Sequence, residues 1–404
     1  MSILKGNVLY GQSGGPTSII NSSALGLIIA CIKNENIDEI YCMHNGLEGL
    51  LKEDLIKIDE NKDYSSLMLT PGAYFGSNRY KIKDYQEDES EYIKILKIIK
   101  KYNIRYLFYN GGNDSMHTLN KIGEYVNLKG YELKVFGIPK TIDNDLYNNY
   151  FSLGFISASN FVKNSILEIA LDDLSYSKGR VNIIETMGRN TGWLACSSLL
   201  VEKYGIDIDI LEIPEISFDE EEFLSKVKNI YEKKHHCLVV VSEGIKNKDN
   251  KLVYKANLKK DEFNHHSLGG VSHYLANLVE SILGYKVRSF ELSLLQRASA
   301  LTLSKLEVNL AMDLSEYLLD QAVNTDENFK VGCIKYFNSY CDHDFYFDLE
   351  DLEKVANYER KMDQSFFNDD HSINKDKVKY YFDTLKSEVF YPFNDEGFID
   401  ILKK

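Results

Sequence analysis

Short apolar segments bounded by glycine and polar residues recur along the first three quarters of the chain. They predict buried strands at residues 6–10, 104–109, 133–137, 181–184, 238–241 and 287–292. Longer stretches between them carry apolar residues at every third or fourth position, which predicts helices. These helices are expected at residues 21–33, 92–101, 116–128, 158–172, 192–203, 271–283 and about 298–322. The alternation of strand and helix indicates an α/β protein with mainly parallel sheets.

The length of 404 residues accommodates two such sheets better than one. The chain has only 5 prolines and no linker rich in proline or serine, so we expect closely apposed domains with a possible chain crossover between them. From about residue 341 the composition becomes acidic and aromatic. We interpret this last region as an appended helical extension that covers one domain, and we assign no chemistry to it.

The formal net charge of −14 argues against a nucleic-acid partner, which requires a basic surface. No apolar run approaches the roughly 20 residues of a membrane span, and the first residues lack the layout of a signal peptide. We therefore expect a cytoplasmic protein without a membrane partner. The cysteines show no C-x-x-C spacing and are expected to be reduced thiols. They are Cys31, Cys42, Cys196, Cys237, Cys333 and Cys341.

Arginine is scarce, since it supplies 7 of the 47 basic residues. A chain that uses lysine for ordinary solvated charge keeps arginine for sites that need a planar, two-pronged donor, such as phosphate recognition. Structural ion pairs are the alternative interpretation for any single arginine. The seven positions are Arg79, Arg105, Arg180, Arg189, Arg288, Arg297 and Arg360.

Two glycine-bearing turns follow predicted strands, at residues 11–15 and 110–115. Glycines such as Gly14 and Gly112 allow backbone N–H groups to approach an anion at a helix N-terminus. Neither turn has the spacing of a Walker A or a dinucleotide motif. The plain alternatives are an ordinary strand–helix turn and a helix cap, with Thr17 or Ser18 capping after the first turn and Asp114 or Ser115 after the second.

The most unusual segment is residues 139–145, where Lys140, Thr141, Asp143 and Asp145 follow a predicted strand. Two carboxylates this close perturb each other's pKa in a partly closed cleft, and one can act as a base. A solvated turn rich in Asn and Asp is the alternative.

Two later strands also end in polar residues that suit a ligand. One is followed by Met187-Gly188-Arg189, where an arginine on a glycine-bearing turn suits an oxyanion, and the other by Glu243, which could accept hydrogen bonds from a sugar hydroxyl or cap a turn. The only histidine-dense segments, His235-His236-Cys237 and His265-His266, lack the spacing of a zinc site.

Taken together, these segments resemble the phosphofructokinase family, specifically its pyrophosphate-dependent branch. The resemblance covers residues 5–320 and rests on seven motifs in the same order, which chance does not produce. They are GQSGGPTSIIN at 11–21, GSNR at 76–79, GGNDS at 111–115, PKTIDND at 139–145, ETMGR at 185–189, SEG at 242–244 and the segment from Arg288 to Arg297.

The resemblance implies two Rossmann-like domains with the active site in the cleft between them. Residues 1–155 with about 296–340 would form the phosphoryl-donor domain, residues 156–295 the fructose 6-phosphate domain, and residues 341–404 the extension. It further implies reversible phosphoryl transfer from pyrophosphate to the 1-hydroxyl of fructose 6-phosphate in glycolysis. Mg²⁺ is the implied cofactor, and a homodimer or homotetramer the implied assembly.

By position in the motifs, the resemblance implies that Asp143 is the base, with Thr141 beside it and Lys140 and Arg189 supporting catalysis. Arg180 and Arg288 would reach the 6-phosphate of a neighbouring subunit's substrate. The implied donor-binding residues are Gly14, Arg79, Gly112, Asp114 and Lys140. The implied sugar-phosphate residues are Thr141, Asp143, Met187, Gly188, Arg189, Glu243 and Arg297, with Asn113 and Asp145 toward the metal.

Two departures from the family pattern affect these assignments. Asn113 stands where relatives carry a metal-binding aspartate, so the metal contact could be water-mediated or come from Asp143, Asp145 and the donor. Leu294 stands where relatives often have a polar residue near the sugar phosphate.

The choice of phosphoryl donor rests on Asp114 and Lys140, because ATP-using relatives tend to carry glycine at both positions. An aspartate at 114 places bulk and negative charge against the α-phosphate of ATP. Lys140 adds a cation for the terminal group of pyrophosphate. The alternatives are an ATP-dependent 6-phosphofructokinase and a non-catalytic regulatory subunit, although the intact Asp143, Asp145 and Arg189 speak against the second. A dehydrogenase is disfavoured because no dinucleotide fingerprint is present.

Overall fold

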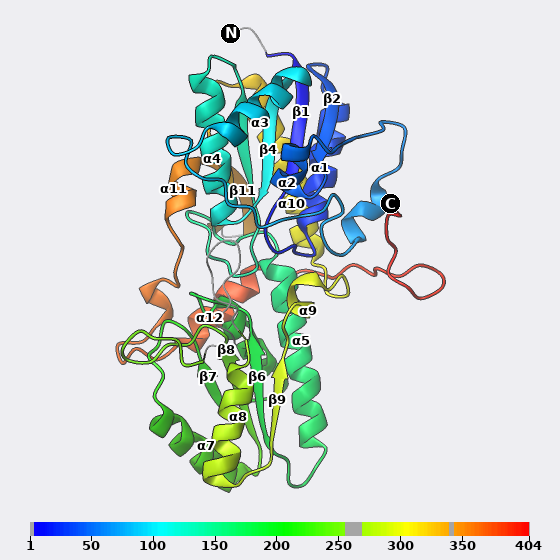
Figure 1. Ribbon diagram of the computed structural model, residues 1–404. Coiled ribbons are helices and arrows are strands. Elements are labelled where there is room, and N and C mark those ends of the chain that lie inside the picture. Colours follow the sequence, from blue (N-terminus) through cyan, green and yellow to red (C-terminus); the bar gives the residue numbers. More distant parts are fainter. Residues whose placement is uncertain (1–3, 255–268, 339–342, 404) are drawn as a thin grey trace.

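The computed structural model describes residues 4–254, 269–338 and 343–403 and has two lobes, one above the other (Figure 1). Each lobe is built on its own sheet, with helices against the faces of the sheet. The predicted α/β architecture with mainly parallel sheets is confirmed. No helix among the described residues is long and apolar enough to cross a membrane.

The larger lobe holds a seven-stranded sheet in the order β11-β10-β5-β4-β1-β2-β3. The central strands are buried and parallel, as the apolar runs predict: β1 (Gly6–Gln12), β4 (Ile104–Gly111) and β5 (Lys134–Pro139). The flanking strands are β2 (Ile37–Met43), β3 (Leu55–Lys57), β10 (Lys330–Asn338) and β11 (His343–Asp351). Of these, β3 and β11 run antiparallel to their neighbours.

Helices cover both faces of this sheet. The helices α1 (Ile20–Ile32) and α10 (Lys305–Asn324) cross so closely that a Cβ on Gly26 would lie 2.5 Å from the backbone of Met312. Glycine at that position therefore allows the helices to pack. The remaining helical segments of the lobe are α2 (Gly46–Lys52), η1 (Ser65–Leu69), α3 (Ser90–Lys101) and α4 (Asn113–Leu128).

The smaller lobe holds a parallel four-stranded sheet in the order β7-β8-β6-β9. Its core is formed by apolar side chains from both faces of β6 (Val181–Thr186) and β8 (Cys237–Ser242). The edge strands are β7 (Ile210–Glu212) and β9 (Val287–Glu291). The helical segments are α5 (Phe155–Leu174), α6 (Trp193–Cys196), η2 (Ser197–Tyr204), α7 (Glu220–Lys234) and α8 (Val271–Leu283).

A buried carboxylate joins the two lobes at the start of α5, a helix without a side-chain cap of its own. Glu307 of α10 accepts hydrogen bonds from the backbone N–H groups of Gly154 at 2.7 Å, Ile156 at 3.0 Å and Ser157 at 2.8 Å. A carboxylate is favoured there because the first N–H groups of a helix lack partners and carry partial positive charge. The larger lobe therefore fixes the helix that leads into the smaller one.

Some predicted elements differ in their bounds. The helix expected at about 298–322 is two helices, α9 (Leu295–Ala298) and α10, because Ser304 adopts an extended conformation and caps α10 by accepting from the N–H of Glu307. The expected cap at Thr17 or Ser18 is wrong, since α1 has no side-chain cap.

The five described cysteines are unpaired and buried, whereas Cys341 and His265-His266 lie outside the described residues.

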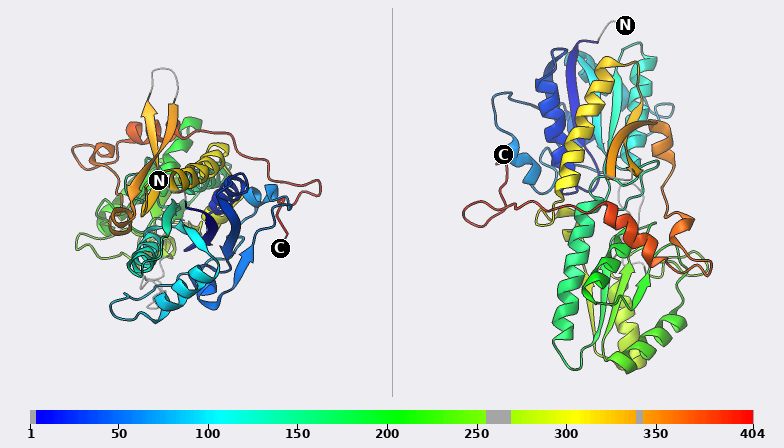
Figure 2. Two further views of the ribbon diagram at one scale, coloured as in Figure 1. Left: turned by 90° about the horizontal axis from the view of Figure 1, so that it is seen from above. Right: turned by 180° about the vertical axis from the view of Figure 1, so that it is seen from behind.

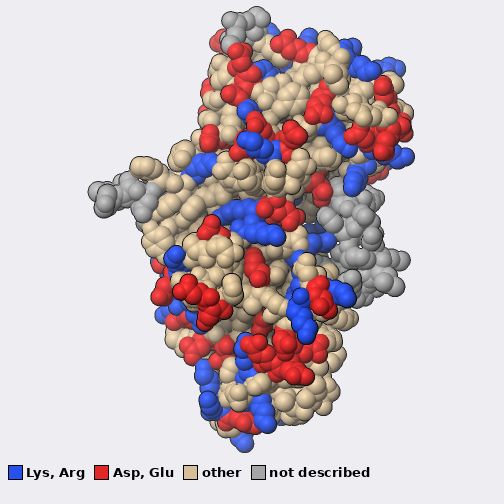
Figure 3. Space-filling model, turned by 90° about the vertical axis from the view of Figure 1, so that its left-hand side faces the viewer, with Lys and Arg blue, Asp and Glu red and all other residues tan. Residues whose placement is uncertain are grey.

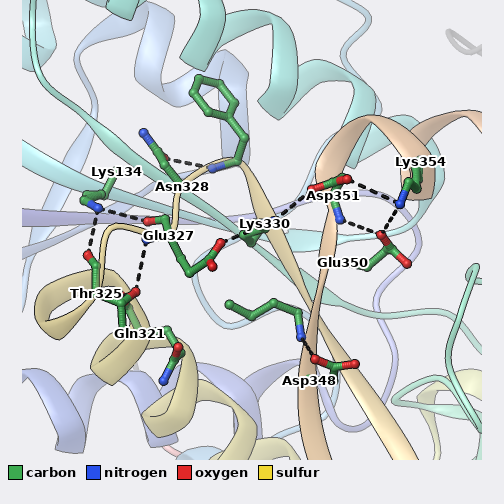
Figure 4. Close-up of polar contacts among 12 residues, drawn as sticks. Lys134, Gln321, Thr325, Glu327, Asn328, Lys330, Asp348, Glu350, Asp351 and Lys354 are labelled. Atoms are coloured by element: carbon green, nitrogen blue, oxygen red, sulfur yellow. Dashed lines mark hydrogen bonds and ion pairs between the residues drawn. The ribbon is translucent and has the colours of Figure 1, made fainter.

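The C-terminal region is more varied than a helical extension. Residues 343–351 form β11 and extend the larger sheet, and only then come α11 (Leu352–Asn357), η3 (Gln364–Phe366) and α12 (Lys375–Thr384). Figure 4 shows how ion pairs anchor this region. The Lys330 ammonium lies 2.8 Å from Asp351 and 3.2 Å from Glu327, and Lys354 pairs with Glu350.

The extension also contacts both lobes rather than one. In the rear view of Figure 2, α12 lies at the junction of the lobes, where Lys375 pairs with Glu202 of η2. The last residues return to the larger lobe, where Ser66 donates to Asp400 at 3.0 Å and the N–H of Leu402 donates to Thr70 at 2.8 Å.

Candidate active site

A cleft of about 640 Å³ lies where the carboxyl ends of the strands of both sheets converge. Ligand sites in open parallel sheets lie at such strand ends. Figure 3 shows acidic and basic side chains meeting at the waist between the lobes. The cleft is lined by residues 14, 15, 17, 79, 112–115, 140–143, 145, 187, 189, 190, 243, 297, 356–359 and 361.

The glycine turn after β1 forms one wall of the cleft. Gly14 has a φ of +76°, which favours glycine, and its N–H donates to the carbonyl of Asn78 at 2.9 Å. A Cβ on Gly15 would lie 2.3 Å from Nη1 of Arg297, so glycine there makes room for the guanidinium. The hydrogen bond from Gly14 to Asn78 holds the turn at 76–79 against the first glycine turn, and the turn at 76–79 carries Arg79 into the cleft.

Lys140 follows β5 and is only 4% exposed. Its Nζ donates to the carbonyl of Gly15 at 2.8 Å, which ties the loop after β5 to the first glycine turn. Burial, together with the positive charges of Arg297 and Arg79, lowers the pKa of the Lys140 ammonium to about 7. Burial and Arg79 also lower the pKa of Arg297. Arg79, Lys140 and Arg297 thus concentrate positive charge in one part of the cleft, an arrangement that favours a polyanionic ligand.

Asp143 and Asp145 reach the cleft from the same loop. The N–H of Asp143 donates to Oγ1 of Thr141 at 3.1 Å, and its carbonyl accepts from the hydroxyl of Thr191 at 2.7 Å. Burial and the Glu243 carboxylate raise the pKa of Asp143, while Arg189 opposes this shift. Burial and the charge of Asp143 raise the pKa of Asp145. Such a pair can hold and release a proton near neutral pH.

The smaller lobe supplies the opposite wall through the turn after β6 and the end of β8. The N–H of Met187 donates to the side chain of Gln296 at 3.1 Å. Gly188 has a φ of +129°, and a Cβ there would lie 2.5 Å from the carbonyl of Thr191. Burial and the charge of Glu185 raise the pKa of Glu243 to about 7, although Arg189 lowers it. The turn therefore presents Arg189 beside a carboxyl that can accept or donate a hydrogen bond.

The second glycine turn places Asn113 and Asp114 at the start of α4. The interpretation of Asp114 as a helix cap is wrong, because the cap position is Gly112 and α4 has no side-chain cap. Asp114 instead lies exposed in the wall of the cleft. The Oδ1 atom of Asn113 is buried without a hydrogen-bond partner.

These residues fit a magnesium ion that arrives with a phosphate ligand. The unpartnered amide oxygen of Asn113 and the carboxylates of Asp143 and Asp145 line one cleft, and Mg²⁺ in phosphate-binding sites takes one or two protein oxygens with the rest from water and phosphate. The described residues contain no cluster of three or more His, Cys, Asp or Glu side chains that would hold a metal unaided.

Arg180 and Arg288 do not line the cleft. Nε of Arg180 lies 3.3 Å from the buried Asp173, whose other oxygen is 2.6 Å from Nδ1 of His236. Arg288 is exposed and lies 4.0 Å from Asp172. Neither arginine reaches the site of its own chain in this structure.

Sequence reasoning missed one wall of the cleft, formed by Ala356, Asn357, Tyr358, Glu359 and Lys361. It also missed Gly15, Thr17 and Asn190 as lining residues. One signal was available, because Arg360 is among the seven scarce arginines and lies in the middle of this segment. Without the tertiary structure, nothing indicated that a segment about 170 residues after Arg189 returns to it.

Comparison with known proteins identifies the family. A family described as Phosphofructokinase matches residues 7–315. The pyrophosphate–fructose 6-phosphate 1-phosphotransferases of Halomonas elongata and Xanthomonas campestris are each 35% identical to this chain, over 96% and 97% of it and 94% of their own lengths. The crystal structure of a pyrophosphate-dependent phosphofructokinase from Nitrosospira multiformis has a TM-score of 0.86 at 33% identity, covering 98% of this chain and 96% of that one. This chain therefore belongs to the phosphofructokinase family, and the predicted resemblance is confirmed.

Proposed function

We propose that this protein transfers a phosphoryl group reversibly from pyrophosphate to the 1-hydroxyl of fructose 6-phosphate, in glycolysis. The products are fructose 1,6-bisphosphate and inorganic phosphate. The relatives named for this reaction span nearly the whole chain. The observation that carries the choice of donor is that the exposed Asp114 and the buried Lys140 both line the same cleft.

Asp114 supports pyrophosphate over ATP as the donor. Because it lies at the start of α4 and is not used as a cap, its carboxylate is available to oppose a third phosphate group in that part of the cleft. Repulsion between the Asp114 carboxylate and an additional phosphate would disfavour ATP relative to pyrophosphate. Pyrophosphate would end before that position, whereas the longer ATP would extend past it.

The cations of this wall would hold pyrophosphate and neutralise its charge. Gly14 and Gly112 bring the backbone of their turns to the cleft, and Arg79, Lys140 and Arg297 supply positive charge. Phosphoryl transfer requires that the two anionic reactants be aligned and their charge offset, with little covalent help from the protein. Mg²⁺, held by Asn113 and Asp145 together with the pyrophosphate, would supply further charge neutralisation when bound.

Asp143 would act as the general base. It accepts the proton of the 1-hydroxyl as that oxygen bonds to the transferred phosphorus, and the bond to the bridging oxygen of pyrophosphate breaks to release phosphate. The raised pKa of Asp143 brings its proton exchange closer to neutral pH, where a general base is most effective. Arg189, Glu243 and the backbone of Met187 and Gly188 would orient the sugar phosphate on the opposite wall.

We further propose that the enzyme is a cytoplasmic homodimer or homotetramer. Arg180 and Arg288 lie outside the cleft of their own chain, tied to Asp173 and Asp172. From that position they could complete the 6-phosphate pocket of a second copy.

The test is sugar-phosphate phosphorylation with pyrophosphate and ATP in parallel, with fructose 1,6-bisphosphate as the measured product. We expect turnover with pyrophosphate, little or none with ATP, and formation of pyrophosphate in the reverse direction. A wild-type protein that uses ATP at least as well as pyrophosphate would contradict the proposed donor and favour the ATP-dependent alternative.

A further inference from the structure

The third wall of the cleft comes from the C-terminal region, beyond the residues that the family description matches. After α11 ends at Asn357, the chain runs along the mouth of the cleft to Lys361. We call residues 356–361 the strap. Five of its six residues line the cleft, and the sixth, Arg360, contacts both lobes.

The strap is hydrogen-bonded to the loop that carries Asp143 and Asp145. The N–H of Arg360 donates to the carbonyl of Asp145 at 2.7 Å, and its Nη1 donates to the carbonyl of Asn144 at 3.4 Å. Glu359 pairs with Leu146 in an antiparallel bridge. The strap is therefore held against this loop by one bridge pair and two hydrogen bonds.

The same two strap residues also hold the opposite wall. The Arg360 guanidinium lies over the ring of Trp193, 4.7 Å from its centroid. Both carboxylate oxygens of Glu359 accept from the Nδ2 atom of Asn190 at 3.1 Å. Asn190 directly follows Arg189, and Trp193 begins α6 three residues later.

We propose that the strap is a working part of the active site, in which Glu359 positions Asn190 and the adjacent Arg189 for the sugar phosphate. In the same proposal, Arg360 fixes the loop of Asp143 against Trp193. The proposal rests on the function proposed above, because it assigns the walls of the cleft to that reaction. Glu359 and Arg360 are positioning residues, since they act through Asn190, the loop backbone and Trp193.

The charge at this place argues against a purely structural role for Glu359. Asp114, Asp143, Asp145 and Glu243 already line the cleft, so a fifth carboxylate there adds repulsion before any ligand binds. A neutral side chain would cover the loop without that repulsion. The compensating effect is that the Glu359 carboxylate fixes the side chain of Asn190 next to Arg189. This matters because small displacements of reacting groups have large effects on phosphoryl transfer.

The first experiment compares Glu359→Ala, Asn190→Ala and the double variant. Fructose 6-phosphate binding is followed by the fluorescence of Trp193, the only tryptophan of the chain, and by the KM values for both substrates. We expect Glu359→Ala to weaken fructose 6-phosphate binding about tenfold while the KM for pyrophosphate stays within about twofold. The double variant should be no worse than the worse single variant, because the two residues act as a pair.

The matched control is Glu353→Ala, which removes an exposed glutamate of α11 six residues earlier and outside the cleft. It should retain wild-type binding and turnover. The thermal unfolding midpoint of each variant shows whether the protein is folded. Wild-type binding by Glu359→Ala, or additive losses in the double variant, would overturn the role of Glu359.

Arg360 is tested with Arg360→Ala and Arg360→Lys, the second of which keeps the charge if the first does not fold. We expect each to lower kcat at least about fivefold with smaller changes in KM, and to alter the emission of Trp193 before ligand is added. Unchanged kcat in both variants would overturn the proposed role of Arg360.

Failure of the proposed function is seen separately, in the wild type. Binding of fructose 6-phosphate without turnover from pyrophosphate contradicts the proposed donor alone and leaves the binding test of the strap intact. Absence of fructose 6-phosphate binding by the wild type would overturn both.

Discussion

The two facing walls of the cleft differ in how complete they are within one chain. On the wall from the larger lobe, Lys140 is buried and bonded to the carbonyl of Gly15, and Gly14 is bonded to the turn that carries Arg79. On the wall from the smaller lobe, Arg189 and Glu243 line the cleft, but Arg180 and Arg288 do not and lie beside Asp173 and Asp172. The first wall has its cations assembled, whereas the second lacks two of the arginines expected to serve it.

This difference predicts that the two proposed substrates are recognised in different ways. Donor binding would use charges such as the buried Lys140, whose positions are set by short-range contacts, so it would be preorganised in each chain. Recognition of the sugar 6-phosphate would depend on assembly, because its remaining positive charges must come from a second copy. The following predictions test this contrast, beginning with the residue that serves both substrates.

The largest effect is expected for Asp143→Ser. The variant lacks the carboxylate proposed to take the proton, so kcat should fall by roughly 10²–10⁴, the range for loss of a general base. Binding of both substrates should change little, because the cations remain. Steady-state kinetics and calorimetric binding check this prediction. A fall in kcat of less than tenfold would mean that Asp143 is not the base.

On the donor wall, Lys140→Met should lower kcat/KM for pyrophosphate by roughly 10²–10³, as expected for loss of a preorganised charge. The pH dependence gives a second test. With a pKa of about 7 in the free protein, Lys140 is mainly an ammonium below pH 7 and a neutral amine above it. Pyrophosphate binds the ammonium form, so its affinity should decrease as the pH rises, by about tenfold between pH 6 and pH 8.

Calorimetric titration of pyrophosphate at both pH values measures this dependence in the wild type and in Lys140→Met. The variant also serves as the control for protonation of pyrophosphate itself, which is common to both proteins. Equal slopes in the two proteins would show that Lys140 does not titrate in this range.

On the sugar-phosphate wall, Arg180→Ala should raise the KM for fructose 6-phosphate about 10–100-fold, the range for one charged hydrogen bond, and leave the KM for pyrophosphate nearly unchanged. Mixing this variant with Asp143→Ser should restore some activity, because hybrid assemblies contain sites with an intact base and an intact Arg180. Sedimentation of the mixture establishes the assembly. A fully active monomer would end the idea that the second wall needs a partner.

The smallest effect is expected for Asp114→Gly, which should lower kcat/KM for pyrophosphate about tenfold and make turnover with ATP measurable. Asp114→Asn keeps the size of the side chain and removes its charge, so it separates repulsion of the α-phosphate from steric exclusion. Parallel assays with both donors give the ratio of kcat/KM values. An unchanged ratio in both variants would show that donor choice lies elsewhere.

Much of this protein could be predicted from its sequence, because the relevant interactions are local. The apolar runs at 104–109 and 181–184 form central strands since their side chains can be buried on both faces of a parallel sheet. The turns after these strands fall at the cleft because parallel strands present their carboxyl ends at one edge. The motifs with Lys140, Asp143 and Arg189 therefore meet in one cleft, as expected.

Other features were decided only by contacts between distant parts of the chain. The lowered pKa of Lys140 depends on burial and on Arg297, which lies 157 positions later in the sequence. The local sequence allows Asp114 either to cap a helix or to face a ligand. In the structure α4 is preceded by Gly112 at the cap position, so Asp114 lines the cleft instead. In the acidic tail the scarce Arg360 was the one signal, and only the fold shows that β11 and α11 bring Glu359 to Asn190. Local patterns determine strands and turns, whereas the charge, burial and neighbours of a site residue depend on which segments the folded chain packs around it.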